Sequence, residues 1–223
     1  MEWQIQVKVN ENLYIKNPEL SQLGRNILAN GVKLIDELGL EEFTFKKLAT
    51  SLNTNESSIY RSFESKHRLL LYFFQWYWRW MEYLLIFKTQ NISDSSEKVN
   101  ILISILLFKN EEFSTDNEGL DKDALHRIMI KEALKTYLTQ HVKADNSLQF
   151  FKPYKDFTAR VSNLILEFKP DYNYSRSLSS TIIEASHQQY FFMNNLPSLT
   201  DFGESKDEIE ITRFLRSLID GIK

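Results

Sequence analysis

The chain of 223 residues contains no cysteine, and it has only 6 glycines and 4 prolines. The absence of cysteine excludes disulfide bonds, thiolate catalysis and cysteine-ligated zinc. The scarcity of glycine and proline favours long helices over a fold of short strands and turns, because both residues interrupt helices. The formal charge of −3 is small, so it neither indicates nor excludes a nucleic-acid partner.

Targeting and membrane signals are also weak. The N-terminus has no apolar stretch behind a basic start, so it does not indicate a secretory signal peptide. The longest apolar stretch, residues 69–87, carries Gln75, Arg79 and Glu82 together with six Tyr or Trp, which makes it a poor membrane span. We therefore expect a cytoplasmic protein without a membrane partner.

Hydrophobic residues make up 43% of the chain and aromatic residues 13%, enough to bury a core. Apolar residues recur at helical spacing along most of the sequence, which predicts an all-α fold of about nine or ten helices. Residues 3–9 instead alternate as in a strand. They could form a short hairpin with residues 13–15 or an extended N-terminal arm.

The first predicted helix starts at Pro18 and ends at Gly39, a residue type favoured just after a helix. Its expected apolar stripe consists of Leu20, Leu23, Ile27, Leu34, Ile35 and Leu38.

Two short helices joined by three residues follow. Thr44 suits the N-cap of the first, which runs to about Leu52, and Asn55 suits the N-cap of the second, over residues 56–63. Asn53 tolerates the left-handed backbone conformation that the break requires. This pattern predicts a helix-turn-helix, whose second helix enters the DNA major groove.

The outward side chains of the second helix are short and polar, as contacts with base edges require. We expect the residues that read bases to be Asn55, Glu56, Ser57, Ser58 and Arg61. Tyr60 suits a phosphate oxygen, and Thr44 and Lys66 lie at helix N-termini, where free N–H groups and the helix dipole favour phosphate.

Local charge agrees with this interpretation. Between Thr44 and Arg68, five basic side chains stand against two acidic ones, a local charge of +3 on an acidic protein. Lys46 belongs to this basic patch, and we include it among the predicted DNA-binding residues. Solvated lysines without a DNA role remain the alternative for Lys46 and Lys47.

The stretch FTFKKLATSLNTNESSIYRSFESKHRLL resembles the signature of the TetR family, and the preceding ILANGVKLIDELGLEEF resembles that family's first helix and glycine turn. The resemblance implies a helix-turn-helix DNA-binding domain at residues 18–66, after an extension at residues 1–17. It further implies a helical ligand-binding and dimerisation domain at residues 67–223. In this family, ligand binding typically shifts the helix after the motif and releases the operator.

Three positions depart from the family pattern. Asn53 stands where glycine is usual, and Glu64 replaces a common proline. Glu56 stands where a basic residue is frequent, and its carboxylate would repel phosphate, although it could accept a hydrogen bond from cytosine N4.

We interpret the chain as a ligand-responsive transcriptional regulator, a repressor that binds a palindromic operator in double-stranded DNA as a homodimer. A helix-turn-helix-derived protein-interaction module without DNA binding is the alternative. An enzyme is not expected, because the Ser, His and acidic residues form no nucleophile motif, and we expect no metal and no cofactor.

The many Phe, Tyr and Leu of the C-terminal domain suggest a small apolar or aromatic effector. Some aromatic residues of the helix over residues 66–87, among them Trp80 and Phe87, could line its pocket or belong to the core. Residues 153–168 and 175–194 are candidates for the dimer interface, with packing inside the subunit as the alternative. The predicted face comprises Leu178, Ile182, Ala185, Gln189 and Met193.

Overall fold

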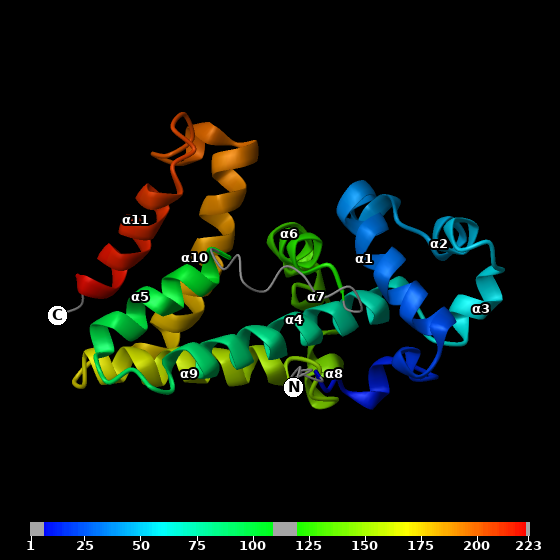
Figure 1. The fold of residues 1–223 in the computed structure, drawn as a ribbon, viewed down its shortest axis with the longest axis horizontal. Coiled ribbons are helices and arrows are strands. Elements are labelled where there is room, and N and C mark those ends of the chain that lie inside the picture. Colours follow the sequence, from blue (N-terminus) through cyan, green and yellow to red (C-terminus); the bar gives the residue numbers. More distant parts are fainter. Residues whose placement is uncertain (1–6, 109–119, 222–223) are drawn as a thin grey trace. The chain divides into compact units, whose positions relative to one another are not determined.

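The computed structural model describes residues 7–108 and 120–221 (Figure 1). Within these ranges it contains eleven α-helices and no strand, which confirms the predicted all-α fold. The count exceeds the expectation because α7 and α8 are short, with 4 and 6 residues. None of the described helices is long and apolar enough to cross a bilayer.

The hairpin expected near the N-terminus is wrong for the residues that the structure describes. Residues 7–10 have no regular structure, and Glu11–Leu13 forms one turn of 3₁₀ helix, η1. Asn10 begins this turn, since its side-chain oxygen accepts from the backbone N–H of Asn12 at 2.9 Å. Residues 1–6, which carry most of the alternating pattern, lie outside the described part.

The described residues divide into two compact units. The first contains residues 7–79 and 120–152, and the second contains residues 80–108 and 153–221. Helix α4, Lys66–Thr89, contributes residues to both. These units are defined by contacts between residues and not by function. The functional boundary predicted at residue 67 therefore stays a prediction.

The first unit holds the N-terminal helices and a middle group of helices. Its further elements are η2 Pro18–Leu20, α1 Gln22–Glu42, α2 Phe45–Ser51, α3 Glu56–Tyr60, α6 Lys122–Glu132, α7 Leu134–Tyr137 and α8 Val142–Ser147. In the second unit the elements besides α4 are α5 Ser95–Leu106, α9 Lys152–Phe168, α10 Ser175–Asn195, η4 Pro197–Leu199 and α11 Glu208–Asp220.

Helix α1 begins later than predicted, after a separate turn. Ser21 is its N-cap, with Oγ accepting from the N–H of Gly24 at 3.1 Å. The preceding turn η2 lies directly against the helix, because a Cβ built on Gly24 would lie 2.0 Å from the carbonyl oxygen of Pro18. Gly39 has φ 76°, so the helix bends there, at the glycine that the sequence marks as its end.

The buried face of α1 is rotated from the predicted stripe. Ile27 and Ile35 are buried as expected, but Leu20 is 78% exposed and belongs to η2. The side chain of Phe73 on α4 packs against Gly31, where a Cβ would lie 3.3 Å from the Phe73 ring. The face therefore runs through small and branched residues: Gly24, Ile27, Leu28, Gly31, Val32 and Ile35.

Most aromatic residues of α4 form core. In the first unit, Phe74 packs edge-on against Trp78 and Phe151, and the Tyr77 hydroxyl lies 2.7 Å from His126 Nδ1 of α6. Burial raises the pKa of Tyr77, so the phenol stays protonated.

Two of the aromatic residues considered for an effector pocket differ in exposure. Trp80 is buried against Phe108 in the second unit, whereas Phe87 is 64% exposed. Trp80 therefore belongs to the core in this structure, which was one of the two alternatives; the other was the lining of a pocket.

The second unit is joined by polar contacts as well as by apolar packing. Arg216 of α11 donates to the carbonyl of Ser96 at 3.1 Å and to Asn100 Oδ1 at 2.8 Å, both on α5. Within the predicted dimer face, Ile182 and Met193 are buried inside the subunit, whereas Leu178 is partly exposed. The face is thus divided between core and surface, and dimerisation stays a prediction.

Candidate nucleic-acid interface

The predicted caps and turn of the helix-turn-helix are present. Thr44 Oγ1 accepts from the N–H of Lys47 at 3.1 Å and so caps α2. Leu48 of α2 is fully buried, and the helix ends before Asn53, whose φ of 50° is the left-handed conformation that the sequence predicts. The two short helices therefore meet at the expected break.

Asn55 organises the start of α3. Its Oδ1 accepts from the Ser58 N–H at 2.9 Å, from the Ser57 hydroxyl at 2.6 Å and from the Ser58 hydroxyl at 2.9 Å. The two serine hydroxyls are thus bound to the cap in this DNA-free structure. To donate to a base they would exchange this contact for a new one.

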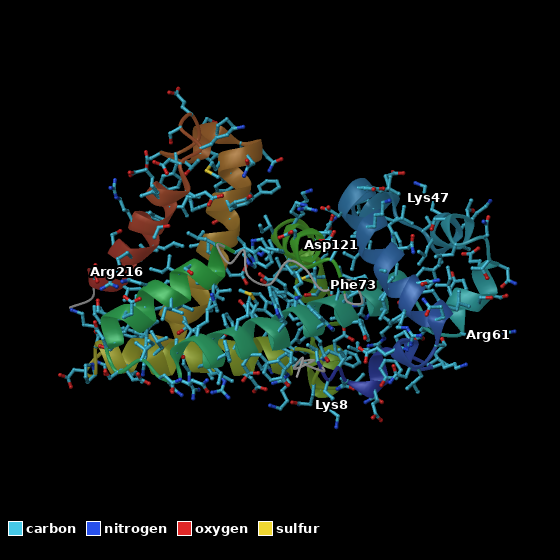
Figure 2. All side chains as sticks on the ribbon, in the orientation of Figure 1. Lys8, Lys47, Arg61, Phe73, Asp121 and Arg216 are labelled. Atoms are coloured by element: carbon cyan, nitrogen blue, oxygen red, sulfur yellow. The ribbon has the colours of Figure 1, made fainter. Side chains whose placement is uncertain are left out.

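The recognition helix has one buried and one exposed side. Ile59 and Phe63 lie four residues apart, the spacing of one helix face, and both are fully buried, so they anchor the helix. Tyr60 is 47% exposed, and its ring lies edge-on to Phe45 at 5.0 Å between centroids. Arg61 is exposed, and Figure 2 shows it at the outer edge of the motif. Glu56 is half-buried on the same short helix.

Lys66 has a role that sequence reasoning missed. Its ammonium donates to the carbonyls of Leu40 at 2.8 Å, Glu41 at 3.1 Å and Phe43 at 3.3 Å. These three acceptors match the three N–H bonds of an ammonium group. The lysine joins the start of α4 to the end of α1, where the helix dipole favours a cation. The partners lie more than 20 residues away, so no local pattern signals them.

The basic patch is smaller than the sequence count suggests. Lys47 donates to the Glu42 carbonyl at 2.7 Å, and Arg68 lies 3.4 Å from Asp145. Lys46 and Arg61 are both exposed on the motif. These two cations are the members of the patch best placed to meet a nucleic acid.

The family comparison bears on this motif. A model described as "Bacterial regulatory proteins, tetR family" matches residues 27–73. These residues match the DNA-binding domain of the TetR family. The resemblance in the sequence is thereby confirmed, and no curated protein sequence matches the chain.

Solved structures agree with the TetR fold over most of the chain. A protein assigned to the tetR family of transcription regulators from Shewanella sp. PV-4 is 12% identical, covers 87% of this chain and 94% of its own, and has a TM-score of 0.60. Superantigen PfiT is 14% identical with coverages of 88% and 93% and a TM-score of 0.56. AibR, in complex with isovaleryl coenzyme A and operator DNA, is 14% identical with coverages of 88% and 95% and a TM-score of 0.55. At these identities the likeness shows the fold alone.

The N-terminal extension is the main element that sequence reasoning did not place. Leu13 is fully buried, and Tyr14 lies edge-on to Tyr72 of α4 at 6.4 Å. Ile15 donates its backbone N–H to the Ser62 carbonyl at 2.8 Å, immediately after the recognition helix. Within residues 7–17 the extension packs on the TetR-type domain, so its described part is no free arm.

A buried acid–phenol contact lies beside the extension. The Tyr72 hydroxyl donates to Glu19 Oε1 at 2.7 Å. Burial, reinforced by the Glu19 carboxylate, raises the pKa of Tyr72 far above its usual value, and burial also raises the pKa of Tyr14. Both phenols therefore remain neutral, which suits packing rather than acid–base chemistry.

Helices α6 and α7 are joined to α1 by ion pairs. Arg127 donates to Asp36 Oδ2 from Nη2 at 2.7 Å and from Nε at 3.0 Å, and this hydrogen bonding raises the pKa of Arg127. Lys135 lies 2.9 Å from Glu41, and Glu132 accepts the Leu40 N–H at 3.2 Å. Any displacement of α6 would therefore act on the end of α1.

The described residues can be compared with two other kinds of site, a metal site and an effector pocket. No group of three His, Asp or Glu side chains within them could hold a metal ion. A surface depression of about 370 Å³ between α1 and α6 is lined by charged groups that include Lys33 and Asp36. That lining does not suit the apolar effector that the sequence suggests.

Proposed function

We propose that this protein is a transcriptional regulator that binds double-stranded operator DNA through α2 and α3. The observation that carries the proposal is the outer side of α3, where short polar side chains and exposed Tyr60 and Arg61 stand above a buried anchor in a TetR-family domain. Side chains of this kind can approach base edges and phosphates in the major groove. The neighbouring AibR structure contains operator DNA, which supports the same use of the fold.

The proposed contacts divide into two groups. Side chains that read bases are proposed at Asn55, Glu56, Ser57, Ser58 and Arg61. Side chains that hold phosphate are proposed at Thr44, Lys46 and Tyr60. Lys66 fits best as a residue that positions α1 against α4, because a phosphate contact would require it to release a carbonyl acceptor.

Regulation and assembly extend the proposal. We infer a homodimeric repressor, because a two-fold dimer matches a palindromic operator. We infer an effector of small apolar or aromatic character, and the isovaleryl coenzyme A bound by AibR makes short acyl compounds sensible first ligands to test. The ion pairs from Arg127 of α6 to Asp36 and from Lys135 of α7 to Glu41 are a route by which such a ligand would act on α1.

A second candidate function rests on two observations. Superantigen PfiT shares this fold, so the fold does not by itself require DNA binding. Glu56 also places a carboxylate on the recognition helix, where it opposes phosphate. A protein-interaction module would show no DNA affinity even at low salt.

The deciding experiment is fluorescence anisotropy with double-stranded DNA from just upstream of this protein's own coding sequence. Scrambled DNA of equal length is the control, and both are measured at two salt concentrations. If the upstream DNA is not bound specifically, selection from a random double-stranded pool supplies a candidate operator. Failure to bind any of these DNAs at low salt would overturn the proposal in favour of the interaction module.

A matched pair of variants tests the interface. Arg61→Ala removes an exposed cation from α3, whereas Arg213→Ala removes an exposed cation from α11. We expect Arg61→Ala to weaken operator binding by about tenfold or more, as the loss of a base contact does. Arg213→Ala should leave binding unchanged, and an equal loss in both variants would mean that only overall charge matters.

A further inference from the structure

We propose that residues 10–15, here called the brace, position the recognition helix on the rest of the first unit without touching DNA. The inference rests on the proposed DNA-binding function, because its consequence is a change in operator affinity. It assigns a task to a segment for which the sequence left open a short hairpin or an extended arm. Three sets of contacts carry it: one at each end of the brace and one in its middle.

The far end of the brace is fixed by Asn10. Its backbone N–H donates to Gln75 Oε1 at 2.9 Å, and its side-chain Nδ2 donates to the Leu148 carbonyl at 2.9 Å. Gln75 is itself buried in α4 and donates to the carbonyl of Phe150 at 2.8 Å. One residue of the brace is thereby bonded both to α4 and to the segment after α8.

The middle of the brace is short and tightly packed. Leu13 is fully buried, and η1 is capped by Asn10, which leaves little slack between the two ends. Tyr14 contacts the ring of Tyr72, and Tyr72 in turn lies edge-on to Phe63 at 5.6 Å. Phe63 is an anchor of the helix-turn-helix, so the apolar contacts of the brace also reach the motif.

The near end of the brace meets the recognition helix itself. The N–H of Ile15 donates to the carbonyl of Ser62 at 2.8 Å, and Ser62 directly follows Arg61. Helix α3 has only 5 residues, and a helix of that length does not keep its place without tertiary contacts. The Ile15–Ser62 hydrogen bond therefore holds the C-terminal end of the recognition helix to the brace.

The contact is made by backbone, which allows a clean test. The Ile15 side chain is 68% exposed, so replacing it disturbs little packing. Ile15→Pro removes the N–H donor, and Ile15→Ala keeps it. Tyr14 has φ −133° and ψ 153°, a conformation that a residue before proline adopts readily. The two variants thus differ mainly in the hydrogen bond to Ser62.

The first measurement is hydrogen exchange of the backbone amides of Arg61, Ser62 and Phe63, which donate to Ser57 and Ile59 carbonyls. We expect exchange in Ile15→Pro to be about fivefold or more faster than in Ile15→Ala, because one net hydrogen bond is lost. Unchanged exchange in Ile15→Pro would overturn the brace. This readout does not need DNA.

The second measurement compares operator and scrambled DNA, well below the thermal transition. A displaced recognition helix should bind the operator about tenfold more weakly and scrambled DNA as before, because non-specific binding depends on charge. Faster exchange with unchanged operator affinity would overturn the positioning role. Failure of the unmodified protein to bind any DNA would refute the proposed function, and exchange alone would then decide the brace.

A second variant covers the case in which Ile15→Pro does not fold. Asn10→Ala breaks the far end of the brace by removing the bond to Leu148 and the cap of η1. We expect exchange of the same three amides to rise about threefold. Asn12→Ala, a change to an exposed neighbour, is the control. Equal exchange in both variants would contradict the brace.

Discussion

Two heptapeptides of this chain have similar sequences and different surroundings: NENLYIK at residues 10–16 and NESSIYR at residues 55–61. Each begins with an asparagine whose Oδ1 accepts a backbone N–H at 2.9 Å. Each then has a glutamate in the first turn, one fully buried aliphatic residue, a tyrosine and a final cation. Leu13 and Ile59 are the buried residues of the two segments.

The asparagines show where the two segments part. Asn10 donates its backbone N–H to Gln75 and its side-chain Nδ2 to the carbonyl of Leu148, and both partners are distant in sequence. Asn55 gathers the hydroxyls of its neighbours Ser57 and Ser58. The first segment therefore makes hydrogen bonds to distant parts of the chain, whereas the second keeps its polar side chains outward. In our proposals, similar local chemistry thus serves support in one place and recognition in the other, and tertiary contacts decide which.

The largest expected effect concerns the two buried aliphatic residues. Leu13→Ala and Ile59→Ala should each lower the free energy of unfolding by about 2–5 kcal/mol, since each leaves a cavity. Urea denaturation measures this, with Ile15→Ala as the exposed control, expected within about 0.5 kcal/mol of the unmodified protein. If Leu13→Ala were as mild as Ile15→Ala, the extension would not be part of the core.

The two cap asparagines come next. Asn55→Ala should cost about 1 kcal/mol of unfolding free energy, as loss of an N-cap does. Asn10→Ala should cost about 2 kcal/mol, because a long-range hydrogen bond to Leu148 disappears as well. Thermal unfolding of the two variants, with Asn55→Ser as a substitution that keeps a capping oxygen, checks the order. A larger loss for Asn55→Ala would reverse the comparison.

The two tyrosines separate recognition from support. Tyr60→Phe should weaken operator binding by about fivefold, the value of one hydrogen bond to phosphate, with little change in stability. Tyr14→Phe keeps the ring that contacts Tyr72 and should leave operator affinity unchanged. Anisotropy titration of both variants measures the difference. Equal affinities would remove Tyr60 from the proposed interface.

The two glutamates give the smallest effect. Glu56→Gln should raise the affinity for scrambled DNA by about two- to threefold at low salt, because a carboxylate no longer opposes phosphate. Glu11→Gln makes the same charge change outside the motif and should do less. The same titration at high salt should erase the difference. A fall in operator affinity for Glu56→Gln would instead support its reading of cytosine.

The features predicted from the sequence are those set by local rules. The caps at Thr44 and Asn55, the bend at Gly39, and the left-handed Asn53 each depend on a few neighbouring residues. The buried anchors Ile59 and Phe63 follow from helical spacing. The outward polar side chains of α3 could also be predicted from the sequence, although their use in DNA binding stays a prediction.

The features that were missed depend on contacts between distant residues. For the described residues the hairpin alternative is wrong, because Asn10 finds its partner 65 residues away on α4, which no alternation reveals. The three carbonyl partners of Lys66 lie more than 20 residues earlier and so escaped notice, while its phosphate contact stays a prediction. The stripe of α1 included Leu20 because the start of the helix was placed three residues before its Ser21 cap.

The close approach of η2 to Gly24 also sets the mutational tolerance of this region. A methyl group at Gly24 would occupy the space of the Pro18 backbone, and no side-chain rotation relieves a clash with a carbonyl. In a saturation library, Gly24 should therefore accept no other residue, while exposed Leu23 beside it accepts most polar ones. We therefore expect substitutions to be excluded at Gly24 and tolerated at Leu23, one residue earlier.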